Sequence, residues 1–282
     1  MTPTECGPFR LLKPLGEGGT GRVFHAVDVR SGSPVALKLL RLTDDEGPAD
    51  ATRDARRGRF LVEAYAARKL SHPRIAAVLA AGEAPPWGWI AMELAPGVAL
   101  TRYTAPSRLL PEPLVMQAGA AVAEALAHAH AAGVVHRDVK PGNVVAHWPS
   151  GSLKLTDFGV ARVADVQATR TGIVPGTPAY MAPELLAGAP PDARGDVYAL
   201  GVMLYELVSG RRPFQGDTLG ALLREVSQGT PVPLQTWAPT MHAGLAALIG
   251  QMLARQPGDR PQRAGAVAEQ LQAWIAGAAP GT

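Results

Sequence analysis

The apolar pattern of the chain changes at residues 95–97, an Ala-Pro-Gly turn. Before this turn the apolar residues come in short runs of strand length, such as residues 34–40 (PVALKLL). After it they recur at helical spacing, as in residues 112–132. The sequence therefore predicts an α+β fold in two lobes, a sheet-rich lobe of about 90 residues and a mostly helical lobe about twice that size.

The same patterns give the order of the elements. In the first lobe we expect a β-hairpin over residues 9–29, a third strand at 34–40, one helix from about 58 to 70, and strands at 75–81 and 87–94. In the second lobe we expect helices at 112–132, 196–209, 243–254 and 262–276. Pro113, Gly133 and Gly210 suit the ends of two of these helices.

Composition and charge argue against several classes of protein. The chain has 282 residues, of which 47% are hydrophobic and 18% charged, so it can bury a large core. Its formal charge is +3 and its basic residues are scattered, which gives no support for nucleic-acid binding. The single cysteine, Cys6, cannot form an intramolecular disulfide, and no apolar run has the length of a membrane span. We expect a soluble, cytoplasmic protein.

Two features of the first lobe point to phosphate binding. Residues 16–23 (GEGGTGRV) could close backbone N–H groups over phosphates, although a plain hairpin turn would also explain them. A dinucleotide-binding loop does not fit, because a strand and not a helix follows the glycines. Lys38 lies in an apolar strand and needs an anion, which Glu63 on the next helix could supply. Such a pair would aim the lysine at the α- and β-phosphates of a nucleotide.

The strongest signal is residues 136–143 (HRDVKPGN), followed after a short strand pair by residues 157–159 (DFG). Asp157 and Asn143 offer hard oxygen ligands to Mg²⁺. Asp138 can orient an attacking hydroxyl and accept its proton, and Lys140 can neutralise charge on the transferring phosphate. The two motifs in this order predict a metal-phosphate site.

Together these segments resemble the eukaryotic-like protein kinase family, in its bacterial Ser/Thr branch. The resemblance covers residues 9–275 and includes residues 182–184 (APE). Residues 140–143 (KPGN) and 176–180 (GTPAY) are similar to those of Ser/Thr kinases and not of tyrosine kinases. It implies transfer of the γ-phosphoryl group of ATP, held with Mg²⁺ or Mn²⁺, to Ser and Thr hydroxyls of protein substrates. It also implies autophosphorylation, by self-association in trans.

The resemblance also assigns roles to single positions. Asp138, Lys140, Lys38 and Glu63 would be the catalytic set, and Asn143 and Asp157 the metal ligands. Val23, Ala36 and Val145 would enclose the adenine, with Met92 as gatekeeper behind it and backbone groups of Glu93 and Ala95 at its edge. The remaining ATP contacts would come from Leu15, Gly16, Glu17, Gly18, Gly19, Thr20 and Gly21. Asp196 would brace the loop at residues 136–143, and Arg260 would pair with Glu184.

Regulation is expected in the segment at residues 160–175. Arg137 brings a positive charge next to Asp138 and needs an anion, and the segment contains Thr169 and Thr171 at positions similar to those phosphorylated in bacterial relatives. Arg162 could supply a second guanidinium. A phosphate would add about −1.5 to −2 charges and three acceptor oxygens, and so order the segment.

The resemblance divides the chain into an N-terminal extension at residues 1–8, a kinase domain at 9–276 and a short tail at 277–282. The domain would comprise an N-lobe at about 9–93, a hinge at about 93–97 and a C-lobe at about 98–276. The chain departs from the family pattern at Ala99, where a polar residue near the ribose is common, and in a longer loop before Glu63.

Two other functions stay open from the sequence. A pseudokinase would keep the fold without the chemistry, but it would be expected to lack Lys38, Asp138, Asn143 or Asp157, and all four are present. A small-molecule phosphotransferase of related fold would lack the segments at residues 176–180 and 182–184 that resemble a polypeptide dock. Many bacterial relatives continue into a membrane helix and a sensor domain after the kinase domain, and the sequence leaves open whether this is a free cytosolic kinase that takes its input from a partner or a piece of such a longer protein.

Overall fold

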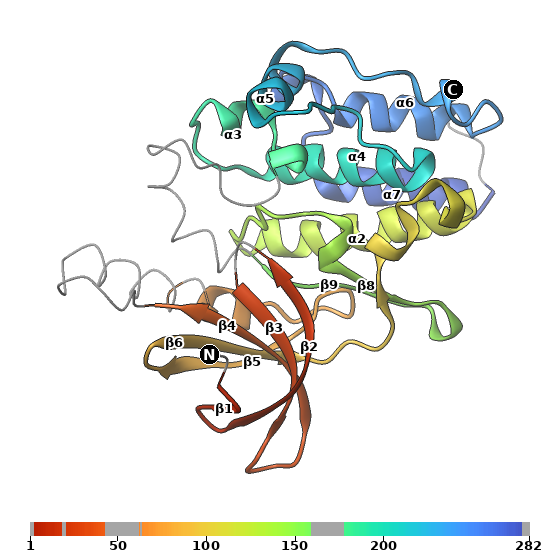
Figure 1. Ribbon diagram of the computed structural model, residues 1–282. Coiled ribbons are helices and arrows are strands. Elements are labelled where there is room, and N and C mark those ends of the chain that lie inside the picture. The colour runs from red at the N-terminus through yellow and green to blue at the C-terminus, as the bar shows by residue number, and fades with distance from the viewer. Residues whose placement is uncertain (1–2, 19–20, 43–61, 63, 159–177, 278–282) are drawn as a thin grey trace. The chain divides into compact units, whose positions relative to one another are not determined.

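The computed structural model describes residues 3–18, 21–42, 62, 64–158 and 178–277, which form two compact units (Figure 1). One unit consists of described residues up to Ala95, and the other begins at Pro96. The first is a β-sheet with one helix, and the second is mostly helical. The predicted α+β fold, with a small antiparallel sheet lobe and a larger helical lobe, is confirmed.

The sheet unit contains six antiparallel strands in the order β1-β2-β3-β4-β6-β5. Hydrogen bonding joins β2 to β3 and β3 to β4 as two successive hairpins. The strands are β1 (Glu5–Cys6), β2 (Phe9–Gly18), β3 (Gly21–Asp28), β4 (Pro34–Arg41), β5 (Val78–Ala84) and β6 (Trp87–Glu93). The hairpin and the third strand lie where the sequence predicts them.

Alternation along the strands separates the sheet into two faces. One face carries an apolar cluster that includes Phe24, Leu37, Leu39 and Trp89. Residues between them in the sequence, such as Ala36 and Lys38, therefore belong to the opposite face. The strand register thus assigns each side chain of β3, β4 and β6 to one face.

One expectation for this unit needs correction. The strand predicted at residues 75–81 begins at Val78 and continues to Ala84. Ile75 and Ala76 are buried in the core, which explains their apolar character, but they precede the strand. Residues 1–8, predicted as an extension, contain the strand β1, which pairs with β2 and buries Cys6 against the sheet core. The predicted helix at 58–70 is helical at the described residues 62 and 64–68.

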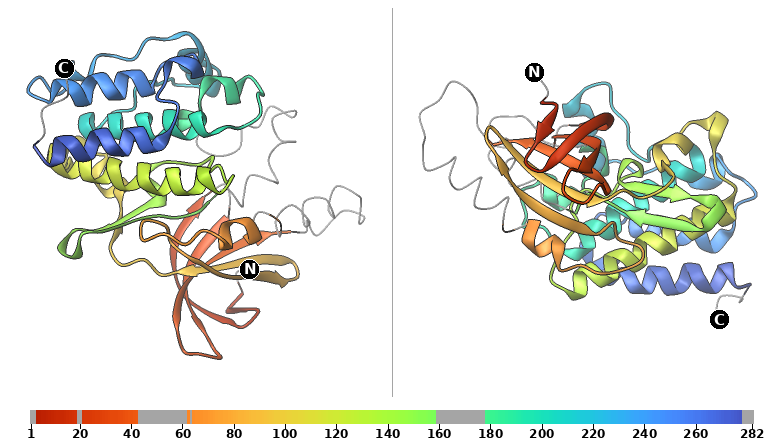
Figure 2. Two further views of the ribbon diagram at one scale, coloured as in Figure 1. Left: turned by 180° about the vertical axis from the view of Figure 1, so that it is seen from behind. Right: turned by 90° about the horizontal axis from the view of Figure 1, so that it is seen from below.

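The helical unit is built around α4 (Ala193–Ser209), which is buried along most of its length. Figures 1 and 2 show α4 between α6 (Ala243–Met252) and α2 (Glu112–Ala131), with α7 (Ala264–Ile275) beside α2. Asp192 caps the N-terminus of α4 by accepting from the N–H of Arg194, and Gly210 ends it in the left-handed conformation.

Short elements complete this unit. Two further helices, which the sequence did not predict, lie before and after α4 in the chain: α3 (Pro183–Leu186) and α5 (Leu219–Gln228). A three-stranded sheet contains β7 (Val98–Ala99), β8 (Val144–His147) and β9 (Ser152–Leu155). The pair β8 and β9 is the predicted strand pair before residues 157–159. Among the residues that the structure describes, no helix is long and apolar enough to cross a membrane.

Candidate functional site

The loop at residues 136–143 is held by one buried carboxylate on α4. Asp196 accepts from the backbone N–H groups of His136 and Arg137, both at 2.7 Å, and from the Nε2 atom of His130 at 2.8 Å. Its residue is only 1% exposed, so these bonds compensate for the loss of water around a charge. The bracing role expected of Asp196 is therefore confirmed, and His130 is a partner that the sequence did not indicate.

His136 links the two ends of the site. Its Nε2 atom lies 2.9 Å from the carbonyl oxygen of Thr156, and its Nδ1 atom accepts from the N–H of Asp138 at 3.2 Å. One ring nitrogen therefore faces an acceptor and the other a donor, which defines the neutral Nε2–H tautomer. The ring also packs against Phe158, with centroids 4.6 Å apart.

Two polar side chains of this loop meet at the carboxylate of Asp138. Its Oδ2 atom accepts from Lys140 Nζ at 2.7 Å and from Asn143 Nδ2 at 2.9 Å, and Asn143 also donates to the Asp138 carbonyl at 2.7 Å. Lys140 and Asp138 are both mostly shielded from solvent. The carboxylate of Asp138 is thereby fixed in direction next to a positive charge.

The β8–β9 hairpin brings Asp157 to the same end of the unit. Asn143 directly precedes β8, and the carbonyl oxygen of Asn143 accepts from both the N–H and the Oγ1 of Thr156, at 2.8 and 3.1 Å. Asp157 is the residue directly after Thr156. Arg137 and Asp157 have φ angles of 68° and 61°, in the left-handed region that non-glycine residues seldom adopt. Each such residue costs about 1–3 kcal/mol, and in folded proteins such strain clusters at functional sites.

The donor atoms of this end of the unit fit a magnesium ion that also binds phosphate oxygens. Asn143 uses its amide nitrogen for two hydrogen bonds, so its amide oxygen is the atom that it can offer to a cation. Asp157 adds a carboxylate. Mg²⁺ is usually held by one or two protein oxygens together with water and substrate phosphates, so these two residues suffice.

In the sheet unit, the predicted nucleotide residues share the face opposite the apolar cluster. Lys38 pairs with Val23 on one side and with Ile90 on the other, and Ala36 pairs with Met92 in the next row. Lys38 is 4% exposed. Glu93 donates its N–H to Ala77, so its carbonyl is the backbone group that it could offer to a ligand.

The turn of the β2–β3 hairpin depends on one glycine. Gly21 has a φ of 126°, and a Cβ atom there would lie 2.3 Å from the carbonyl oxygen of Leu39. Leu15, Gly16 and Glu17 precede the turn on β2, and Leu15 is exposed. Six predicted residues lie outside the described part of the chain, and their roles stay predictions: Gly19, Thr20, Glu63, Arg162, Thr169 and Thr171.

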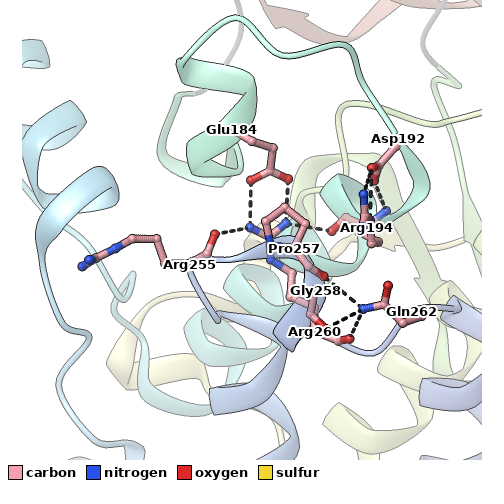
Figure 3. A network of polar contacts seen from close by, with 8 residues as sticks. All are labelled: Glu184, Asp192, Arg194, Arg255, Pro257, Gly258, Arg260 and Gln262. Atoms are coloured by element: carbon pink, nitrogen blue, oxygen red, sulfur yellow. Dashed lines mark hydrogen bonds and ion pairs between the residues drawn. The ribbon is translucent and has the colours of Figure 1, made fainter.

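A second buried charge joins α3 to the start of α7 (Figure 3). The guanidinium of Arg260 binds Glu184 in bidentate fashion, at 2.7 and 2.8 Å, which confirms the predicted pair. Its other donors reach the carbonyl oxygens of Ala254, Arg194 and Arg255. Because every N–H of the buried guanidinium has a partner, this ion pair fixes residues 182–186 against α4.

A tyrosine–carboxylate pair near this site was not predicted from the sequence. Tyr180 donates its hydroxyl to the carboxylate of Glu206, in the last turn of α4. Burial, followed by the nearby charge of Glu206, raises the pKa of Tyr180 far above its usual value. The neighbouring charge of Asp138 contributes to the same shift, so Tyr180 and Asp138 belong to one electrostatic neighbourhood.

Comparison with known proteins agrees with this geometry. The model of the protein kinase domain family matches residues 9–273. The chain is 36% identical to the serine/threonine-protein kinase Pkn1 of Myxococcus xanthus, over 98% of this chain and 39% of Pkn1. It is 37% identical to PknA of Mycobacterium tuberculosis, over 98% of this chain and 63% of PknA. The chain thus spans less than two thirds of the length of these relatives.

A solved structure supports the fold alone, because its sequence identity is only 22%. It is the crystal structure of Rad53 1–466 in complex with AMP-PNP. The match covers 95% of this chain and 65% of the Rad53 chain, with a TM-score of 0.77. The family predicted from the sequence is confirmed by the family model and by the two bacterial relatives. The chain belongs to the protein kinase family, in the branch of the bacterial Ser/Thr kinases.

Proposed function

We propose that this chain is a Ser/Thr protein kinase that transfers the γ-phosphoryl group of ATP to protein hydroxyls. The observation that carries the proposal is the carboxylate of Asp138, held by Lys140 and Asn143 on a loop that Asp196 braces. Such a fixed carboxylate beside a cation is what an in-line transfer needs from the protein, since catalysis of this reaction rests on positioning and charge.

In the proposed reaction, Asp138 accepts a hydrogen bond from the substrate hydroxyl and takes its proton. The hydroxyl oxygen forms a bond to the γ-phosphorus while the bond from that phosphorus to the β–γ bridging oxygen breaks, so that ADP leaves. Lys140 lies 2.7 Å from Asp138 and would stabilise the negative charge on the transferring group. Mg²⁺, or Mn²⁺, held by Asn143 and Asp157, would neutralise the phosphates.

The remaining residues would bind ATP. On the sheet unit, Lys38 would contact the α- and β-phosphates with Glu63 as its partner, and the glycine-rich turn would cover the phosphates through backbone N–H groups. Val23, Ala36 and Val145 would contact the adenine, Met92 would lie behind it, and Ala95 and the carbonyl of Glu93 would bind its edge. The kinase domain would extend over residues 9–276 and act in the cytoplasm, where ATP is available.

The test is transfer from labelled ATP to a Ser/Thr protein substrate by the wild-type chain and by Asp138→Asn. We expect transfer that requires Mg²⁺ or Mn²⁺, and a loss of about 10²- to 10⁴-fold in turnover for Asp138→Asn with ATP binding retained. Asp217→Asn, an exposed acid on the same unit, is the matched control and should keep full turnover. Equal turnover in Asp138→Asn and wild type would contradict the proposal, and ATP binding without any transfer would identify a pseudokinase.

We also propose that the chain phosphorylates itself on Thr169 and Thr171, by association of two copies, and that phosphate there pairs with Arg137 and Arg162. Two guanidinium groups and a phosphate can form one to three charge-assisted hydrogen bonds. The double variant Thr169→Ala, Thr171→Ala should lose the phosphate and most of its activity on an added substrate. Undiminished activity in that phosphate-free variant rules the switch out.

A further inference from the structure

Thr156 lies next to both of the proposed metal ligands. The last residue pair of the β8–β9 ladder is Val144 and Leu155. Directly beyond it, the carbonyl oxygen of Asn143 accepts from two groups of Thr156, the backbone N–H at 2.8 Å and the Oγ1 hydroxyl at 3.1 Å. The hydroxyl therefore adds a second bond to one carbonyl oxygen at the point where the sheet ends and Asp157 follows.

The backbone of Thr156 also connects to the loop that carries Asp138. Its carbonyl oxygen accepts from Nε2 of His136 at 2.9 Å, and Nδ1 of His136 accepts from the N–H of Asp138 at 3.2 Å. Asn143 donates its Nδ2 to the carbonyl oxygen and to the Oδ2 atom of Asp138, at 2.7 and 2.9 Å. Thr156 and Asn143 are thus both joined to Asp138, and the bonds between them close a ring of hydrogen bonds.

Of the bonds that Thr156 makes in this ring, only the one from the hydroxyl depends on the type of side chain. Any residue except proline would keep the bonds of the backbone N–H and C=O. Asp157, the next residue, has a φ angle of 61°, which a non-glycine residue adopts only where surrounding contacts hold the backbone. The hydroxyl bond of Thr156 is such a contact, one residue away from the strained position.

We propose that Thr156 is a positioning residue, whose hydroxyl sets the placement of Asn143 relative to Asp157 and thereby the affinity of the site for the divalent cation. The inference rests on the proposed kinase function, which assigns the cation to these two ligands. Mg²⁺ demands near-ideal octahedral geometry, so a small displacement of either ligand oxygen weakens its binding. Thr156 acts through its two neighbours and needs no contact with the cation.

The experiment compares Thr156→Val, which keeps the β-branched shape without the hydroxyl, with Thr156→Ser, which restores the hydroxyl. Mn²⁺ is titrated into the full chain with one equivalent of a non-hydrolysable ATP analogue, and the EPR signal of the free ion is followed, with the analogue alone as the blank. We expect the dissociation constant of Mn²⁺ to be about three- to tenfold larger in Thr156→Val, which corresponds to one hydrogen bond of ordinary net strength. Thr156→Ser should bind Mn²⁺ nearly as tightly as wild type.

Thr104→Val is the matched control. The hydroxyl of Thr104 also donates to a backbone carbonyl oxygen at 3.1 Å, that of Thr101 in the same unit. This bond ends the short helix η1 (Leu100–Tyr103) and not the β8–β9 hairpin, so the variant should bind Mn²⁺ as wild type does. Thermal unfolding of each variant shows that it is folded, and Thr156→Ala replaces Thr156→Val if the latter does not fold.

Transfer assays on the same proteins give a second readout. In Thr156→Val, the Mg²⁺ concentration for half-maximal transfer should rise by a factor similar to that for Mn²⁺ binding. Turnover should return towards the wild-type value at saturating Mg²⁺, because the hydrogen bonds of Asp138 to Lys140 and Asn143 do not involve the hydroxyl. A loss of turnover that excess Mg²⁺ does not restore would contradict the role in metal placement.

The outcomes separate this inference from the function on which it rests. Equal Mn²⁺ binding in wild type and Thr156→Val, or an equal loss in Thr156→Ser or Thr104→Val, overturns the role of Thr156, and transfer by the wild-type chain leaves the kinase assignment standing. If the wild-type chain transfers no phosphate, the kinase assignment falls, while the Mn²⁺ titration still decides the role of Thr156. If the wild-type chain binds no Mn²⁺, the assignment of Asn143 and Asp157 as metal ligands falls together with this inference.

Discussion

The two units hold their functional residues in different ways. In the helical unit, a single buried carboxylate, Asp196, collects hydrogen bonds from α2 and from the loop at residues 136–143. In the sheet unit, Lys38 and Ala36 owe their direction to strand register, which many backbone hydrogen bonds share. Replacing the single side chain of Asp196 should therefore displace the loop at residues 136–143. The direction of Lys38 and Ala36 should change only when the backbone of the sheet changes.

The largest effect that we expect from this difference follows from Asp196→Asn. The amide offers one oxygen to the two N–H groups of His136 and Arg137, so at least one buried donor loses its partner. We expect a loss of about 2–4 kcal/mol in the free energy of unfolding, measured in urea, because an unsatisfied buried group costs about 1–3 kcal/mol and the charge is lost as well. Turnover should fall about 100-fold, and more than ATP affinity, because the misplaced loop carries Asp138 as well as the metal ligand Asn143.

His130→Gln sharpens this prediction. Glutamine keeps a donor for Asp196 and leaves both backbone bonds in place, so the variant should lose much less stability and turnover than Asp196→Asn. If Asp196→Asn weakened ATP binding as much as turnover, the claim that Asp196 acts on the loop of the helical unit alone would be wrong.

A backbone change should have the next largest effect, in the sheet unit. Gly21→Ala places a Cβ atom 2.3 Å from the carbonyl oxygen of Leu39 at a φ of 126°, and so shifts the β2–β3 turn. We expect a loss of about 1–3 kcal/mol in stability and a higher KM for ATP, with kcat less affected. The matched variant is Gly16→Ala on the same hairpin, where a Cβ would meet nothing within 4 Å. Equal effects of the two substitutions would refute the argument from register.

The smallest effect concerns the start of α4. The side chain of Arg194, which binds Asp192, lowers the pKa of that carboxyl below its ordinary value, so Asp192 stabilises the fold when ionised. This contribution is present above the unfolded pKa of about 3.9 and is lost as the pH falls through the folded pKa. Asp192→Asn keeps the cap but loses the charge, and should cost about 0.3–1 kcal/mol at pH 7.

The measurement for Asp192 is the unfolding free energy of both proteins between pH 3 and pH 7. The difference between wild type and Asp192→Asn should narrow towards the acid end. A difference that stays constant with pH would show that the charge of Asp192 adds nothing to the cap.

The sequence predicts most of the long elements because their apolar faces are complete. In α2 the buried residues include Ala118, Val122, Ala125 and Ala129 at helical spacing, while α4 is apolar and buried along most of its length and ends at Gly210 as expected. The helix α5 was not predicted from the sequence, because it is short, lies between Gly216 and Gly229 and buries only Val226. Ile75 was predicted as the start of a strand because its apolar side chain marks burial, but the continuous strand begins only at Val78.

The residues of the site likewise fall into those that the sequence predicts and those that it does not. Asp138, Lys140, Asn143 and Asp157 could be found from the sequence because their types and spacing are specific to phosphoryl transfer. Tyr180, Glu206 and His130 could not, since contacts between residues 26 or 66 positions apart depend on the packing of helices that no local pattern reveals.

The left-handed backbone at Arg137 and Asp157 has a consequence for how this chain can evolve. Glycine would adopt either conformation without strain, so a search for greater thermal stability alone would favour glycine at both positions. Such a search would discard the guanidinium and the carboxylate together with the strain. The two positions therefore mark where selection for activity opposes selection for robustness, and a stabilised version of this protein should be sought by changes elsewhere in the chain.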